Sequence, residues 1–162
     1  IARLRGNAAA LSWLKAIKRN AKVLADNELI AAAVNKGSVA AGLVDHYYWY
    51  RQRDEVGAAN TKSALHYFAP HDPGMLVDVS GAAVLKSSKH AADAQRFLAY
   101  LVSKPAQTII ATSESYEYPL RPGVVNHKIL RPLSSLVPAR VTATQLGDGK
   151  AALAMLQEVG LL

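Results

Sequence analysis

Tyrosine gathers in one short segment of the 162-residue chain. Three of the seven tyrosines fall in residues 45–51, which read Asp-His-Tyr-Tyr-Trp-Tyr-Arg. Phenolate oxygen is a hard anionic donor that suits ferric iron, and a bound cation offsets the cost of deprotonating a phenol whose ordinary pKa is about 10. Two interpretations follow. Either Tyr47 and Tyr48 bind such a metal, or these aromatic side chains pack a core or line an apolar binding surface.

A buried strand followed by a loop is expected to position the two tyrosines. Residues 39–44 form a short, continuous apolar run, which is typical of a strand buried on both faces of a parallel sheet. Tyr47 and Tyr48 follow its carboxyl end, where open α/β sheets bind their ligands. Neighbouring side chains of a regular helix diverge, so the pair could share one ion only from a loop or a distorted first turn. The position after a strand predicts a loop, which continues as polar sequence over residues 51–63.

Strands and helices are predicted to alternate along the rest of the chain. Further strands are expected over residues 64–68 and 75–85. Helices are expected over residues 8–20, 27–36, 89–102 and 148–159, and Pro105 is expected to open another in its first turn. This alternation predicts an α/β fold class.

Composition excludes several kinds of protein. The chain is 51% apolar and 19% charged, as globular proteins are, and it has no cysteine, so a metal must take oxygen or imidazole ligands. The net charge of +7 raises nucleic-acid binding as an alternative, but the tightest basic group has helical spacing and no interleaved aromatic residues, which favours a solvated helix face. That group is Lys15, Lys18, Arg19 and Lys22.

Neither the histidines nor the serines indicate an enzyme. The histidines lack a metal-ligand spacing such as His-x3-His, and no serine lies in a Gly-x-Ser-x-Gly elbow. We therefore expect no catalysis and place the histidines at surface or turn positions. They are His46, His66, His71, His90 and His127.

Motifs spread over nearly the whole chain resemble one family of transport proteins. They are residues 10–15 (ALSWLK), 26–28 (DNE), 34–37 (VNKG), 72–74 (DPG), 79–85 (VSGAAVL), 94–98 (AQRFL) and 117–119 (EYP). With the tyrosine pair, they are similar to the C-terminal half of the ferric-iron substrate-binding proteins of bacterial ABC importers. That family is extracellular solute-binding family 1, with the type II periplasmic-binding-protein fold.

The resemblance implies roles for individual residues. It makes Tyr47 and Tyr48 metal ligands for Fe(III), and it makes Asn27 a contact to a carbonate or phosphate that completes the iron shell. A helix start is a plausible anion site, although Asn27 is equally well explained as a helix cap. The family's other anion-contacting asparagine is replaced by Asp45, whose charge would repel an anion, so a different anion or none is expected. The remaining ligands would come from N-terminal parts that this chain lacks.

The resemblance also implies an architecture and a function. Two lobes are built from discontinuous segments, here incomplete: residues 1–76 in the second lobe, 77–127 returning to the first lobe, and 128–162 as a C-terminal helical segment of the second. The protein would capture ferric iron between the lobes and deliver it to a membrane permease, in the periplasm or anchored outside the cell. Alternatives are another small ligand, such as a sugar, an organophosphate or thiamine, and a basic nucleic-acid-binding module. Because the chain begins at Ile1 without a targeting signal, we expect a piece of a longer protein, with strand exchange or a bound N-terminal fragment covering its unpaired segments.

Overall fold

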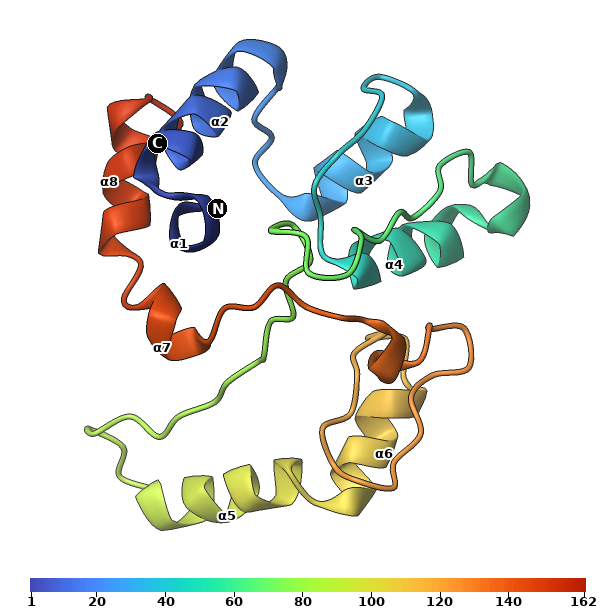
Figure 1. Cartoon of the computed structure of the whole chain (residues 1–162). Helices are drawn as coiled ribbons and strands as arrows, with labels where there is room; N and C mark the ends of the chain where they lie inside the picture. The colour runs from blue at the N-terminus through green and yellow to red at the C-terminus, as the bar shows by residue number, and fades with distance from the viewer. The chain divides into compact units, whose positions relative to one another are not determined.

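The regular structure of the chain is helical (Figure 1). The computed structural model describes residues 1–162, apart from the side chain of Ala143. The α-helices are α1 (Ala2–Arg5), α2 (Asn7–Asn20), α3 (Asn27–Lys36), α4 (His46–Val56), α5 (Ala91–Leu101), α6 (Lys104–Thr112), α7 (Ala143–Leu146) and α8 (Lys150–Glu158). Two short 3-10 turns are η1 (Ala58–Asn60) and η2 (Leu133–Ser135). None of the helices in the described chain is long and apolar enough to cross a membrane.

Local signals explain where several helices begin. The helices predicted over residues 8–20, 27–36, 89–102 and 148–159 are confirmed to within two residues at either end. α6 starts after Ser103, whose Oγ accepts a hydrogen bond from the backbone N–H of Ala106 at 3.4 Å. Pro105 lies in the first turn of α6, where the N–H that proline lacks would have no partner within the helix.

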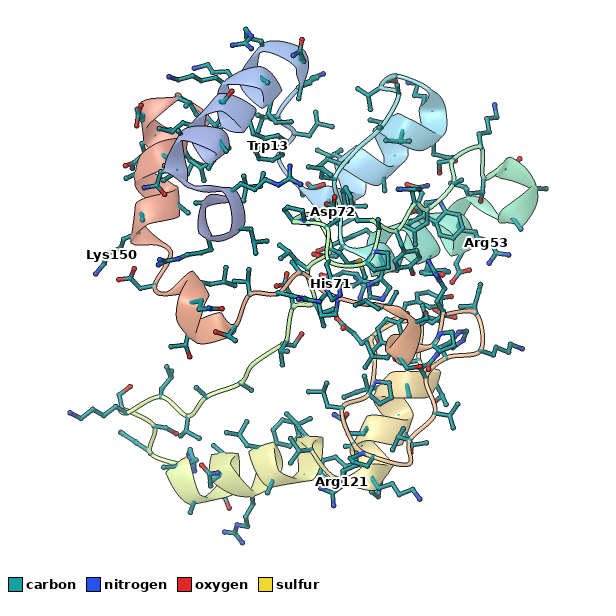
Figure 2. The ribbon with its side chains drawn as sticks, in the orientation of Figure 1. Trp13, Arg53, His71, Asp72, Arg121 and Lys150 are labelled. Atoms are coloured by element: carbon teal, nitrogen blue, oxygen red, sulfur yellow. The ribbon has the colours of Figure 1, made fainter. Side chains whose placement is uncertain are left out.

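Two compact units divide the chain. Unit 1 comprises Ile1–Asp26, His66–Val77 and Val137–Leu162, and unit 2 comprises Asn27–Leu65 and Asp78–Leu136. In unit 1 the turn that carries His71 and Asp72 (Figure 2) is joined to a distant part of the sequence. The N–H of His71 donates to the carbonyl of Val137 at 3.1 Å, and the carbonyl of Met75 accepts from Ala139 at 2.8 Å. Unit 2 contains α3 to α6 and a core built on Tyr50, Tyr116 and Leu130.

The strands predicted over residues 39–44, 64–68 and 75–85 are not present among the described residues. These segments have no regular secondary structure. An apolar segment becomes a strand only when another extended segment lies beside it and satisfies its N–H and C=O groups. No described segment provides such a ladder, and part of the apolar surface remains uncovered. The side chain of Leu85, for example, is 75% exposed.

The tyrosine segment is helical rather than a loop. α4 runs from His46 to Val56, so the loop predicted for Tyr47 and Tyr48 and for residues 51–63 is wrong over most of its length. The segment contains no proline or glycine until Gly57, which follows the helix with a φ of 82° that a side chain would disfavour. The pair therefore lies in the first turn of a helix.

Candidate metal site

Tyr47 and Tyr48 lie close together on the first turn of α4. Both side chains are half-buried, their ring centroids are 4.4 Å apart and their planes meet at 40°. The N–H of Tyr48 donates to the carbonyl of Asp45 at 3.2 Å, which closes the first turn. Two neighbouring phenols are thus held side by side at the accessible end of a helix, where other donors can approach.

The hydroxyl of Tyr47 lies beside two other oxygen-bearing side chains. It donates to Oδ2 of Asp45 at 3.3 Å, and the side chain of Tyr48 packs next to it. The neighbouring side chain of Tyr48 raises the pKa of Tyr47 far above its ordinary value, and partial burial and the negative charge of Asp45 raise it further. Tyr47 therefore holds its proton firmly, and only a strongly acidic cation would displace that proton at neutral pH.

Arg51 lies one turn further along α4 and faces both rings. Its guanidinium carbon is 5.1 Å from the ring centroid of Tyr47 and 5.9 Å from that of Tyr48. A guanidinium at this distance is attracted to the electron-rich face of an aromatic ring. Arg51 follows Tyr48 by three residues and Tyr47 by four, so it lies beside each ring on the helix surface and contacts both.

Another face of α4 is fixed by Tyr116. His46, Tyr50 and Asp54, each four residues apart, contact it in succession. Nε2 of His46 lies 2.8 Å from the carbonyl oxygen of Tyr116, the rings of Tyr50 and Tyr116 stack at 5.1 Å, and the hydroxyl of Tyr116 donates to the carboxylate of Asp54. Burial, and then the hydrogen bond to Asp54, raise the pKa of Tyr116 to about 12. These contacts hold the helix that presents the tyrosine pair.

Sequence reasoning missed this support. His46 was expected at the surface or in a turn, yet it lies in the first turn of α4 and is partly buried against Tyr116 and Tyr118. Asp54 and Tyr116 were not singled out at all. The spacing of His46, Tyr50 and Asp54 is a helical signal, but their partner lies 62 to 70 residues away.

Aromatic packing accounts fully for Tyr50 and in part for Tyr47. Tyr50 is 6% exposed and forms the core of unit 2 with Tyr116 and Leu130. Tyr47 also packs against that core but stays half-buried. A ligand therefore has access to Tyr47 and Tyr48, whereas Tyr50 is occupied by packing.

Asn27 is the first residue of α3, a helix that packs against α4. Its side chain is half-buried, and Glu28 adds a negative charge to the same turn. No hydrogen bond or ring contact among the described residues joins Asn27 to the tyrosine pair. The two helices are also tied through a loop: Oδ1 of Asn35 in α3 accepts from the N–H of Lys62 at 2.7 Å.

Imidazole and carboxylate groups do not assemble a metal site of their own. Within the described part of the chain, no three histidine, aspartate or glutamate side chains are grouped so that they could hold an ion. His71 and His127 each bond to backbone groups near them in space. The phenol oxygens of the tyrosine pair therefore remain the candidate hard donors in the part of the chain that the structure describes.

Comparison with known proteins identifies the family. A family model described as bacterial extracellular solute-binding protein matches residues 4–132. The chain belongs to this family. Among its solute-binding relatives, the major ferric iron-binding protein of Neisseria meningitidis serogroup B is 40% identical over 99% of this chain and 48% of its own length. The Fe(3+)-binding periplasmic protein of Serratia marcescens is 37% identical over 98% of this chain and 47% of its own length.

A solved structure matches the whole fold of this solute-binding chain. Iron-bound HitA from Pseudomonas aeruginosa superimposes with a TM-score of 0.90 at 40% identity, over 98% of this chain and 51% of that protein. The match confirms the predicted fold class, that of the periplasmic binding proteins. The chain spans about half the length of the curated relatives it matches.

Proposed function

We propose that this solute-binding chain holds ferric iron through the phenolate oxygens of Tyr47 and Tyr48. The observation that carries the proposal is the pairing of the two rings, with centroids 4.4 Å apart on the first turn of α4. Ferric iron is a hard trivalent ion and replaces the phenolic protons, which supplies two anionic oxygens from neighbouring positions. Relatives named for ferric iron binding support the choice of metal.

The intact protein would act as a carrier without catalysis. It would take up iron between two lobes, in the periplasm or anchored outside the cell, and deliver it to the permease of an ABC importer. In this proposal residues 1–76 and 128–162 belong to the second lobe, and residues 77–127 return to the first. The remaining iron ligands come from outside this chain. Where carbonate or phosphate completes the shell, Asn27 at the start of α3 is the contact we assign.

Absorbance spectroscopy tests the role of the tyrosine pair. Ferrous chloride is added to the chain and oxidised to ferric iron by CO2-free oxygen, so that no chelator competes with the protein for iron. We expect weak binding because the ligand set is incomplete. The titration is therefore followed in solution without a separation step. Phenolate bound to Fe(III) should produce a visible charge-transfer band. Tyr47→Phe and Tyr48→Phe should each weaken or shift the band, and the double variant should lose it while retaining the helical circular dichroism of the parent.

Tyr100→Phe is the matched control, because Tyr100 is an exposed tyrosine on α5 of the same unit. This variant should give the band of the parent. Since each phenol must lose its proton to bind, the band should also fade as the pH is lowered. A double Phe variant that binds iron as the parent does, or a parent without a band at any iron concentration, would overturn the proposal.

A further inference from the structure

The carboxylate of Asp45 does not cap α4, although the residue lies at the N-cap position of that helix. Asp45 is the N-cap of α4, with an extended backbone (φ −69°, ψ 145°), and aspartate at this position ordinarily accepts a hydrogen bond from an N–H group of the first turn. The side chain makes no such bond. It is exposed and accepts instead from the hydroxyl of Tyr47, at 3.3 Å. Helix capping therefore does not explain where this carboxylate points.

Three oxygen-bearing side chains lie together at this helix start. Oδ2 of Asp45 accepts a hydrogen bond from the hydroxyl of Tyr47, and the ring centroid of Tyr48 lies 4.4 Å from that of Tyr47. A proton shared between two oxygens marks a position that a small hard cation can occupy in its place. Oxygen ligands that bond such a cation at about 2.1 Å lie roughly 3 Å or slightly more from one another, and the separation of Asp45 and Tyr47 falls in that range.

We infer that Asp45 is a third iron ligand, an anionic oxygen built into the chain that makes an added carbonate or phosphate dispensable. The inference rests on the proposed function of the tyrosine pair. When iron binds, the O–H bonds of Tyr47 and Tyr48 break, both protons pass to solvent, and three oxygen–iron bonds form while the iron remains ferric. Three negative oxygens then match the charge of one Fe(III) ion.

The negative charge of Asp45 favours Asp45 itself, rather than a bound carbonate or phosphate, as the third iron ligand. Asparagine at this position would be neutral and could donate a hydrogen bond to an anion, whereas a carboxylate repels an anion and attracts a cation. An anion bound beside Asp45 would therefore be destabilised at the place where the two phenols require a third hard donor. Asn27 then serves as the first residue of α3, with no anion to contact.

Anion dependence of iron binding tests the inference. The chain is loaded from ferrous chloride and CO2-free oxygen in buffer free of carbonate and phosphate, and the band is recorded before and after phosphate or bicarbonate is added. The parent should show its full band without either anion. Asp45→Asn should bind iron at least about tenfold more weakly in the anion-free buffer, and added phosphate should restore its band. Asp45→Glu, which keeps the carboxylate, should remain independent of the anion.

Asp93→Asn is the matched control, because Asp93 is an exposed aspartate of the same unit that pairs only with Arg96 on its own helix among the described residues. It should behave as the parent does. A parent that needs phosphate or bicarbonate for its band, or an Asp45→Asn variant that matches the parent without them, would overturn the assignment of Asp45 while leaving the tyrosine pair intact. If the parent shows no band either with or without anions, the proposed roles of Tyr47 and Tyr48 as iron ligands and of Asp45 as the third ligand would both be overturned.

Discussion

Tyr116 contacts α4 at three positions and does so from a left-handed backbone, with a φ of 57°. That conformation costs a bulky L-residue about 1–2 kcal/mol. The ring stacked on Tyr50, the hydroxyl bonded to Asp54 and the carbonyl that faces His46 offset this cost. Tyr116 is thereby a positioning residue for the helix that carries the tyrosine pair.

The raised pKa of Tyr116 predicts a specific loss of stability in alkali. Burial and the bond to Asp54 raise the pKa of Tyr116 to about 12 in the folded state, against about 10 in the unfolded state. The folded state thus holds the proton more tightly. This contribution, of order 2 kcal/mol, is complete below about pH 10 and is lost as the pH rises toward 12.

Urea unfolding across this pH range measures the effect. Tyr116→Phe should lower the free energy of unfolding at neutral pH by about 1–2 kcal/mol, because the hydrogen bond is lost, and its stability should then fall less steeply than that of the parent between pH 10 and 12. Tyr100→Phe should follow the parent. Parallel curves for the parent and Tyr116→Phe would show that Tyr116 does not hold its proton in this way.

At the scale of elements, residues 39–44, which precede α4, pack closely against α3. A Cβ atom on Gly42 would collide with Cγ2 of Ile30 and lie 3.2 Å from Cγ2 of Val34. Ile30 and Val34 are four residues apart on one face of α3. Residues 39–44 therefore contact a helix through a glycine, although they form no strand, and this contact helps to position α3 relative to α4.

Gly42→Ala should destabilise unit 2 by about 1–3 kcal/mol, because the β-branched side chains of Ile30 and Val34 belong to a helix and have little freedom to change χ1 and move aside. Thermal unfolding measures the change. Ile30→Ala in the same chain should relieve part of the loss, and the coupling between the two substitutions would identify the collision as its cause. Gly81→Ala is the matched control, because a Cβ there meets nothing within 4 Å. Equal effects at the two glycines would refute the packing argument.

At the scale of the whole molecule, unit 2 leaves many apolar side chains in solvent. The exposed set in residues 78–136 includes Val79, Leu85, Phe97, Ile109 and Val125, and Val125 is 82% exposed. Apolar surface of this kind together with irregular segments that lack strand partners favours association. We propose that a second copy, by strand exchange, or an N-terminal fragment covers this surface.

Analytical ultracentrifugation of the purified chain tests this proposal. The average mass should rise with concentration, and Phe97→Ser combined with Val125→Ser should reduce the rise by removing apolar surface from unit 2. Leu153→Ser, at an exposed leucine of α8 in unit 1, should have little effect. A mass that stays monomeric at every concentration, with no copurifying fragment, would contradict the proposal.

Local chemistry made much of this protein predictable from its sequence. The helix starts at Asn27 and near Pro105 depend on residues within one turn, so their patterns could be recognised directly. The concentration of tyrosine at residues 45–51 pointed to the candidate site, and the motifs along the chain pointed to the family. Neither conclusion required knowledge of contacts between distant residues.

Tertiary contacts decided the rest. Residues 39–44, 64–68 and 75–85 have strand-like composition, but a strand requires a partner, and no described segment supplies one. Tyr116 supports α4 across more than sixty residues of sequence, and that support keeps Tyr47 and Tyr48 on a helix rather than a loop. The sequence alone nominated Tyr47 and Tyr48 as candidate metal ligands. Only the folded structure determined that the carboxylate of Asp45, at the N-cap position of α4, makes no capping bond and accepts from Tyr47 instead, because side-chain direction depends on the backbone around it.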